Sequence, residues 1–476
     1  MNIKQNFIGI LALCLAGMAL ADVKLPTVFA DGMVLQQKSR VTVWGWAEPG
    51  EKVTVKGSWQ WLWGASTQAG KDGTWRIRLK TPKAGGPHTL TVKGNNRIVL
   101  NDVLTGEVWV CSGQSNMQWS MAALKTEEGK KAIAEADFPQ IRLFTVPRKF
   151  AAQPQADCDG QWQVCTPETV KDFSAVAYYF GRQLHQQLNV PIGLIHTSWG
   201  GTVAEAWMSQ GALREFGGFD AELDKLQTPD PHDDKFPNHN TPSALFNKMI
   251  YPLLQFRIAG AIWYQGESNV ARWRQYRTLF PALIADWRAQ WGQGDFPFYY
   301  VQIAPYKYTD SKAVGAALLR EAQMLTLKTV NNVGMAVTMD IGEEKDIHPR
   351  NKHDVGRRLA LWALAKTYGQ KGLVYSGPIY TGMKIERDTI RLMFDSVGGG
   401  LMSRGGPLTH FEIAGADRVF VPAKAVIDGN TVVVSASAVA QPAAVRYGFT
   451  NWAQPNLFNK EGLPASSFRT DDWPME

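Results

Sequence analysis

Ser115 is the residue of this chain best placed to act as a nucleophile. It lies in the run VWVCSGQSNMQWSM, where an apolar strand ends at Cys111 and small residues turn the backbone before the hydroxyl. A serine attacks an acyl carbon only when a base accepts its proton and N–H donors stabilise the oxyanion that forms. Other parts of the chain must therefore supply a base and these donors.

Three further segments carry polar residues directly after apolar runs: SWGGT at 198–202, YQGESN at 264–269 and DIHP at 346–349. His348 in the last segment is the candidate base. An imidazole with a pKa near neutrality can take the serine proton and return it to a leaving alkoxide. We predict that the three segments meet Ser115 in one site.

The elements that must position these segments follow a strand, loop and helix order over 103–370. The runs PIGLIHT, IAGAIWY, FYYVQIA and VGMAVTMDI predict strands, and SAVAYYFGRQLHQQL predicts a helix with Ser174 as its N-cap. This alternation indicates a parallel sheet with crossover helices. Ligand sites form at the carboxyl ends of such strands, where all the candidate residues lie.

Both flanking regions have β character. Residues 22–102 contain short runs such as VTVWGWA and TWRIRLK between turns, which predict a β-sandwich domain. Val41, Val43, Trp44 and Trp46 fit strands that face a core. WQWLW at 59–63 instead suits an exposed aromatic loop. Residues 371–476 form a second β-rich region, which we expect to pack on the central part.

Residues 1–21 predict a signal peptide, with Lys4, an apolar stretch and the small-residue site Ala19-Leu20-Ala21. The apolar stretch is too short for a membrane span, so we expect no membrane anchor and a secreted or periplasmic protein. The net charge of +7 includes no run of five Lys or Arg residues, and we therefore expect no nucleic-acid partner.

In order along the chain, LPTVFADGMVLQ, GEVWVCSGQSNM, SWGGT, WYQGESN and DIHPRNKHDVGRRLA resemble the sialate O-acetylesterase family, a branch of the SGNH-type (GDSL-like) carbohydrate esterases. The resemblance covers nearly all of the chain after residue 21. It implies a flavodoxin-like three-layer α/β/α hydrolase core, to which the flanking regions would add accessory β-sandwich-type domains. We expect the reaction to need no metal or organic cofactor. It also implies that Ser115 is the nucleophile and His348 the base, whereas Ser112 and Ser120 do not match.

The carboxylate that orients His348 departs from the common spacing. Many members of the wider superfamily place Asp three residues before the base, but Lys345 occupies that position here and Asp346 lies two before. In an extended loop residues two apart point the same way, so Asp346 can still reach the imidazole. A backbone carbonyl or Glu267 are alternatives, and a Ser–His dyad is another.

The oxyanion hole is expected to include the backbone N–H of Ser115. The resemblance implies a glycine and a side-chain amide as the other donors, and these match Gly201, or its neighbour Gly200, and Gln265. The wider superfamily has Asn at the amide position, which keeps Asn269 as an alternative. Both glycines are also explained by a turn that needs them.

Several residues near these motifs are candidates for substrate binding. Glu267 can bind a sugar hydroxyl, orient the base or hydrogen-bond within its own loop. A sialate carboxylate requires an arginine, for which Arg272 and Arg274 are candidates. Asn269 and three tryptophans complete the set, although each tryptophan also suits the core: Trp199, Trp263 and Trp273.

Two features outside the motifs remain. Export favours a disulfide between Cys158 and Cys165, which would leave Cys111 as a buried free thiol. The polar stretch 224–241 predicts a long surface loop. Its His and Asp residues are too irregularly spaced to predict a metal site.

The sequence thus predicts an exported carbohydrate O-acetylesterase that cleaves acetylated sugars or oligosaccharides through an acetyl-enzyme intermediate. An esterase of acetylated plant polysaccharide, xylan or xyloglucan, is the alternative substrate assignment. A non-catalytic carbohydrate-binding protein is a more distant one.

Overall fold

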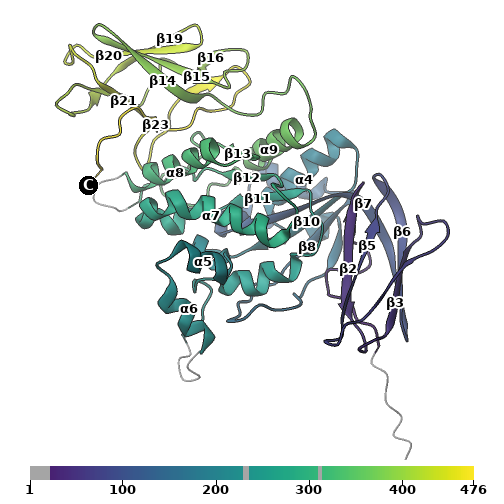
Figure 1. Cartoon of the computed structure of the whole chain (residues 1–476). Helices are drawn as coiled ribbons and strands as arrows, with labels where there is room; N and C mark the ends of the chain where they lie inside the picture. Colours follow the sequence, from purple (N-terminus) through teal and green to yellow (C-terminus); the bar gives the residue numbers. More distant parts are fainter. Residues whose placement is uncertain (1–21, 229–234, 309–313, 476) are drawn as a thin grey trace, which may run out of the picture.

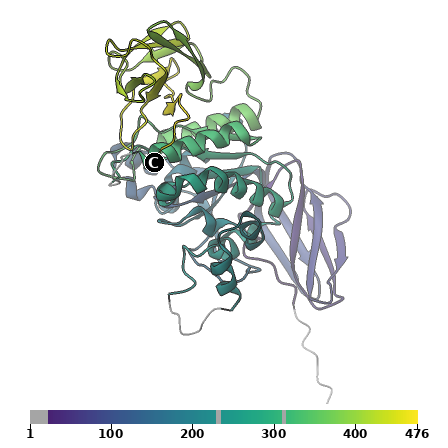
Figure 2. The same cartoon turned by 60° about the vertical axis from the view of Figure 1, so that its left-hand side comes forward.

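The computed structural model describes residues 22–228, 235–308 and 314–475 (Figure 1), so the predicted signal peptide lies outside the described residues. A mixed α/β centre lies between two β-rich parts, one at each end of the chain (Figures 1 and 2). The central sheet has the order β13-β12-β11-β7-β10-β8-β9. Its strands are β7 (Arg97–Gly113), β8 (Phe138–Thr145), β9 (Trp162–Cys165), β10 (Ile192–Ser198), β11 (Gly260–Tyr264), β12 (Phe298–Val301) and β13 (Val333–Ala336).

The strands from β13 to β8 pair in parallel, as the alternation predicted, while β9 pairs antiparallel with β8 at the edge. The sheet is therefore mixed. The longer helices are α4 (Ala175–Leu188), α7 (Trp273–Trp291), α8 (Gly315–Thr329) and α9 (Lys352–Trp362). In α4 the Ser174 side chain accepts the Ala177 N–H, so the predicted N-cap is confirmed.

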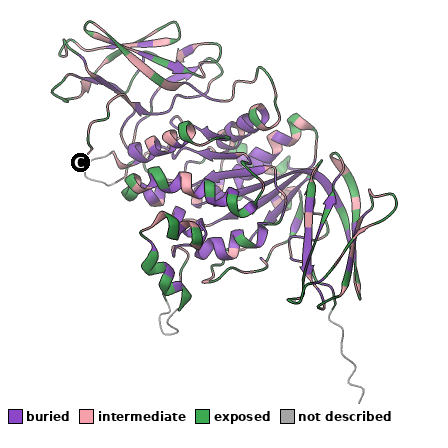
Figure 3. Cartoon of the chain, viewed as in Figure 1, coloured by how far each residue is buried: buried purple, intermediate pink, exposed green. Residues whose placement is uncertain are grey.

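Helices cover both faces of the central sheet, and its strands are largely buried (Figure 3). Successive side chains of β11 point into two different hydrophobic cores, one on each face of the sheet. Trp263 belongs to the core built with α7 and α8, whereas Ile262 belongs to the core built with α4 and α9. The shorter helical segments are α1 (Ser115–Gln118), η1 (Ala122–Leu124), α2 (Glu127–Ala134), α3 (Pro167–Val170), η2 (Ala204–Trp207), α5 (Gln210–Phe216), α6 (Asp220–Gln227), η3 (Phe246–Ile250), η4 (Tyr251–Leu253), η5 (Glu267–Arg272) and η6 (Ala363–Thr367).

β7 joins the N-terminal part to the centre without a linker. Its first half pairs with β6 and β1, and its second half pairs with β10 and β11. The boundary predicted between residues 102 and 103 thus falls inside one strand of 17 residues. The other N-terminal strands are β1 (Val34–Gln36), β2 (Arg40–Trp46), β3 (Lys52–Gly57), β4 (Ala65–Gln68), β5 (Thr74–Lys80) and β6 (Gly85–Lys93).

The side chains of β2 alternate between two surroundings. Val41 and Val43 are buried between the sheets, as predicted, but Trp44 and Trp46 lie on the opposite face, toward the central part. The prediction that these side chains face a core therefore holds for Trp44, which is 7% exposed, and is wrong for Trp46, which is half-buried. The aromatic loop is confirmed, because Trp61 is 93% exposed and Trp63 83%.

The C-terminal strands form their own hydrophobic core. They are β14 (Ile379–Glu386), β15 (Thr389–Asp395), β16 (Leu401–Ser403), β17 (Phe411–Ala414), β18 (Val421–Pro422), β19 (Lys424–Asp428), β20 (Thr431–Ser435), β21 (Ala444–Tyr447), β22 (Leu457–Asn459) and β23 (Phe468–Arg469). This part packs on α8, where Asn451 accepts the Ala316 N–H at 2.8 Å and the buried Arg320 donates to Ser467 at 3.2 Å.

The predicted disulfide between Cys158 and Cys165 is wrong. Cys158 lies in the hydrophobic core of α7 and α8, and Cys165 lies in the core of α4 and α9, so the sheet separates them. All three described cysteines are free and buried. Burial raises the pKa of the Cys111 thiol well above its usual value, which leaves it unsuited to nucleophilic attack.

The predicted loop at 224–241 begins later than expected. Residues 224–227 belong to α6, which buries Leu223 and Leu226. Part of the stretch, 229–234, lies outside the described residues. Across the described ranges, no group of three or more His, Cys, Asp or Glu side chains is arranged to hold a metal ion. No helix in these ranges is long and apolar enough to cross a membrane.

Candidate active site

The turn after β7 places Ser115 at the start of α1. Gly113 has φ of 138°, and a Cβ there would lie 2.1 Å from the carbonyl oxygen of Tyr264. Only glycine fits this approach between β7 and β11. Ser115 then begins the helix, and its backbone N–H has no acceptor among the described residues, as is usual in a first helical turn.

His348 lies beside the serine. Its Nε2 is 2.9 Å from Ser115 Oγ, the distance of a hydrogen bond. The indole of Trp119 stacks on the imidazole with 5.2 Å between ring centroids and 17° between planes. Burial and then the charge of Lys352 lower the pKa of His348, while Asp346 acts in the opposite direction. The imidazole is thus neutral near pH 7 and able to accept the serine proton.

Asp346 contacts the same histidine from within the loop. One oxygen, Oδ1, accepts the backbone N–H of His348 at 2.9 Å and lies 3.4 Å from its Nδ1. The two-residue spacing does bring the carboxylate to the imidazole. Glu267 makes no hydrogen bond to His348 in the described structure, because its carboxylate is directed toward Asn116 instead.

Asn116 joins three of the predicted segments behind the serine. It is fully buried and donates to Glu267 Oε1 at 2.6 Å and to the Ile347 carbonyl at 3.0 Å. Its own oxygen accepts from Lys352 Nζ. Sequence reasoning missed the roles of Asn116 and Lys352, although both lie within the recognised motifs.

Lys352 and Glu267 are two buried ionisable groups in this network. Burial lowers the pKa of Lys352 to about 7, against the opposing effect of the Glu267 charge. Burial also raises the pKa of Glu267. The ammonium lies over the rings of Trp119 and Tyr264, at 5.7 and 5.5 Å from their centroids. The network therefore places an amine close to the stacked Trp119–His348 pair.

The SWGGT turn lies directly against the serine. A Cβ on Gly200 would be 3.1 Å from Ser115 Cβ, and the Gly200 N–H donates to Gln118 Oε1 at 2.6 Å. Gly201 has φ of 74°, and its N–H has no acceptor among the described residues. Of the two glycines, Gly201 is thus the one with a free donor.

The amides of Gln265 and Asn269 are used elsewhere. Gln265 Nε2 donates to Asn269 Oδ1 at 2.6 Å and to the Thr202 carbonyl at 3.2 Å. Asn269 Nδ2 donates to Glu205 Oε2 at 3.1 Å. These bonds hold the SWGGT and QGESN loops together, and they leave no N–H of Gln265 for an oxyanion.

The residues predicted to bind substrate are mostly engaged with other groups. Arg272 pairs with the buried carboxylate of Glu205, and Arg274 donates to the Met475 carbonyl. Trp199 is half-buried and stacks on His239 at 5.2 Å. Trp263 is fully buried in the core. Both arginines therefore already have a partner in this structure.

A cleft of about 620 Å³ lies beside the site, at the carboxyl ends of β8 and β10 and next to the end of α1. Gln118 and Trp119 line it; Gln118 is the last residue of α1, the helix that Ser115 begins. Arg148 also lines it, is exposed and has no hydrogen bond or ion pair to any described residue. The cleft is the size of a small-ligand site, and sequence reasoning singled out neither Gln118 nor Arg148.

Comparison with known proteins shows what this chain is similar to. A sequence profile described as carbohydrate esterase, sialic acid-specific acetylesterase, matches residues 105–365. The sialate O-acetylesterase of Rattus norvegicus is 33% identical over 402 residues, which cover 73% of this chain and 74% of the relative. The Homo sapiens sialate O-acetylesterase is 35% identical over 387 residues, covering 73% and 72%. The crystal structure of a carbohydrate acetylesterase from Xanthomonas citri superposes with a TM-score of 0.86 at 40% identity, covering 95% of this chain and 100% of that chain.

Proposed function

The chain belongs to the family of sialic acid-specific carbohydrate acetylesterases, and from this premise we propose that Ser115 and His348 carry out its reaction, with Asp346 orienting the imidazole. The protein is a carboxylic ester hydrolase and a carbohydrate O-acetylesterase. The 2.9 Å contact between Ser115 Oγ and His348 Nε2 is the observation that carries the assignment.

In the first step Ser115 Oγ attacks the acetyl carbonyl carbon while His348 Nε2 takes its proton. The free N–H groups of Ser115 and Gly201 stabilise the resulting oxyanion, in place of the amide of Gln265. The carbon–oxygen bond to the sugar then breaks, and the sugar oxygen receives the proton from His348. Water attacks the acetyl-enzyme by the same route and releases acetate.

The nucleophile is tested with 4-nitrophenyl acetate and Ser115→Ala. We expect a loss of kcat/KM of roughly a thousandfold or more, since the nucleophile and its proton transfer disappear together. Ser66→Ala, an exposed serine on β4, is the matched control and should keep full activity. Mass spectrometry of the acid-quenched reaction should find an acetyl group on the Ser115 peptide. An acetyl group on another residue would refute the assignment.

The substrate is proposed to be an O-acetylated sugar bound in the cleft beside Trp119. The names of the curated relatives support sialate. In that sugar the carboxylate would face Arg148, because Arg272 and Arg274 are already engaged. Acetate release from acetylated sialic acid, xylan and xyloglucan under one set of conditions distinguishes the assignments. Arg148→Gln should weaken hydrolysis of the sialate ester alone.

We extend the proposal to the organisation and export of the chain. Helices on both faces of the central sheet support an SGNH-type three-layer core over 103–370. Separate strands support a β-sandwich at 22–102 and a β-rich region at 371–476. Cleavage after Ala21 would make Asp22 the first residue of the exported protein, which N-terminal sequencing of the secreted or periplasmic fraction tests.

A further inference from the structure

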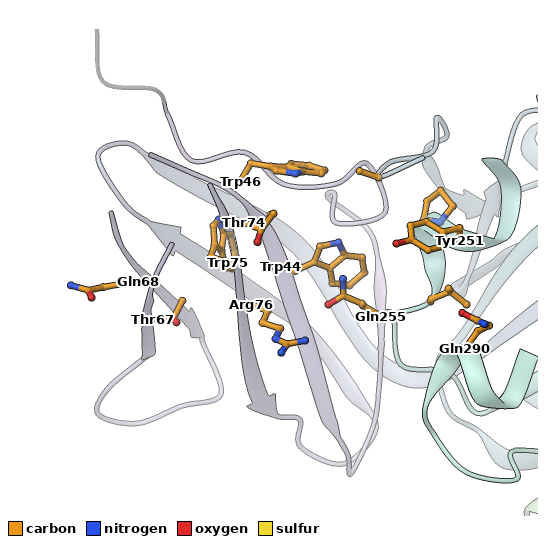
Figure 4. Close-up of a pocket in the computed structure, with 14 residues that line it drawn as sticks. Trp44, Trp46, Thr67, Gln68, Thr74, Trp75, Arg76, Tyr251, Gln255 and Gln290 are labelled. Atoms are coloured by element: carbon orange, nitrogen blue, oxygen red, sulfur yellow. The ribbon is translucent and has the colours of Figure 1, made fainter. Parts of the chain in front are cut away.

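A second groove lies between the N-terminal β-rich part and the centre. Its wider section, about 730 Å³, lies between the strands β2 and β5 and the segment 251–255 (Figure 4). A narrower section of about 410 Å³ shares Arg76, Leu254, Gln255 and Gln290 with it. The segment 251–255 precedes β11, whereas Ser115 lies where β11 ends. The groove therefore lies near the amino ends of the central strands, whereas Ser115 lies at their carboxyl ends.

The wider section presents aromatic rings. Trp46 is half-buried on the outer face of β2, and Tyr251 on the facing segment is 42% exposed. Figure 4 shows Trp44 on the side of the strands that looks toward Tyr251. Partly exposed rings of this kind offer apolar faces on which a sugar ring can stack.

The narrower section is cationic. Four arginines line the groove, and Gln255 and Gln290 lie among them: Arg40, Arg76, Arg78 and Arg257. None of the four guanidinium groups has a hydrogen bond or ion pair with a described residue. No Asp or Glu occurs among the described residues that line either section.

Arg40, Arg76 and Arg78 are exposed, so their charges face the groove and the solvent and not the core. Arg76 and Arg78 lie two residues apart and share one face of β5, and Arg40 lies directly opposite Lys80. Like charges paired across strands repel. A guanidinium offers a planar pair of donors that matches a carboxylate. A ligand with several carboxylates would therefore find four guanidinium groups that no described protein group already binds.

We propose that this groove binds an acidic polysaccharide, a chain of sugars that carry carboxylates. The seven paired residues of β2 and β5 span about 20 Å, room for several consecutive sugar rings. Sugar rings would stack on Trp46 and Tyr251 while carboxylates meet the arginines. The choice of a sugar chain over other polyanions rests on the carbohydrate esterase activity. The groove would anchor the polymer that carries the acetyl groups without taking part in ester cleavage.

Isothermal titration calorimetry with hexagalacturonate tests the proposal. The full chain carrying Ser115→Ala is used as the reference protein, and the fully methyl-esterified hexamer serves as an uncharged ligand of equal length. We expect binding of the acid that weakens as sodium chloride is raised from low to high concentration, and no measurable binding of the ester. Equal binding of both hexamers would overturn the proposal.

Substitutions locate the site. Arg76→Gln/Arg78→Gln should weaken binding of hexagalacturonate about tenfold or more, because two charge-assisted contacts are lost. Lys93→Gln/Arg97→Gln is the matched control, since it removes two exposed charges from a cross-strand pair of the same β-rich part. Arg148→Gln tests the cleft beside Ser115. Both control proteins should bind within about twofold of the reference.

Three results would contradict the inference: unchanged binding by the Arg76/Arg78 variant, loss of binding by Arg148→Gln, or tighter binding of single-stranded DNA of equal charge than of hexagalacturonate. Thermal melting checks that each variant is folded. Because binding is measured in a protein that lacks the nucleophile, its failure leaves the assignment of Ser115 untouched, and loss of that assignment leaves the binding result untouched.

Discussion

Asn116 Nδ2 lies 2.6 Å from Glu267 Oε1, so the residue after Ser115 is held by the loop that follows β11. The same side chain also contacts Lys352 and the backbone carbonyl that precedes His348. One buried amide thus links the segments that carry Ser115 and His348. Its geometry ties three distant parts of the chain to one active site.

Asn116→Ala should therefore lower both stability and activity. The substitution leaves Lys352 and Glu267 without their shared partner in a buried site, which costs about 1–3 kcal/mol for each unsatisfied group. We expect a lower Tm and a fall in kcat while KM changes little, because the base is displaced and the cleft is not. Asn331→Ala, at an exposed position, provides the control. An unchanged kcat would show that the network does not position His348.

The pH dependence of kcat/KM should report a neutral His348. Its pKa is lowered below the usual 6.5 by burial and by Lys352, so the imidazole stays unprotonated to lower pH than an exposed histidine would. The acidic limb of the profile should have its midpoint below pH 6.5, with activity rising as pH increases through it. A midpoint above pH 6.5 in the free enzyme would contradict this picture.

Asp346→Asn separates a triad from a dyad. The carboxylate raises the pKa of His348, so its removal should shift the acidic limb to still lower pH. It should also reduce kcat about 10- to 100-fold, since a partly exposed carboxylate stabilises the imidazolium by ~1–3 kcal/mol. Asp354→Asn, which removes a carboxylate from the first turn of α9, controls for the change in charge. A shift of the limb to higher pH, or no change in kcat, would favour the dyad.

Gly113→Ala should destabilise the protein more than Gly201→Ala. The new Cβ at position 113 would meet the Tyr264 carbonyl at 2.1 Å, whereas nothing lies within 4 Å of a Cβ at position 201. We expect a loss of about 2–4 kcal/mol for the first change, from backbone strain and displacement of β11. The second should cost only the ~1–2 kcal/mol of a left-handed backbone. Urea unfolding of both variants measures the difference, and equal losses would contradict this account of the turn.

Much of the fold could be predicted because local signals agree with it. Ser174 and the four-residue apolar spacing after it define α4, and the apolar runs before SWGGT and QGESN do form parallel strands. The boundary at 102/103 could not be found from composition, since β7 continues through it as a member of two sheets. A sequence pattern indicates which residues of one strand are buried, but it does not indicate which other strands pair with that strand.

For the site, the sequence alone determined the residue types able to do the chemistry: a serine after a tight turn and a histidine after a distant strand. Tertiary structure alone decided their surroundings. It brought Asp346 to the imidazole, put Cys158 and Cys165 on opposite sides of the sheet, and bound the amide of Gln265 to the Thr202 carbonyl of a second loop. Partners of this kind depend on how loops and strands pack in three dimensions, whereas the identity of a reactive group is given by a single position of the sequence.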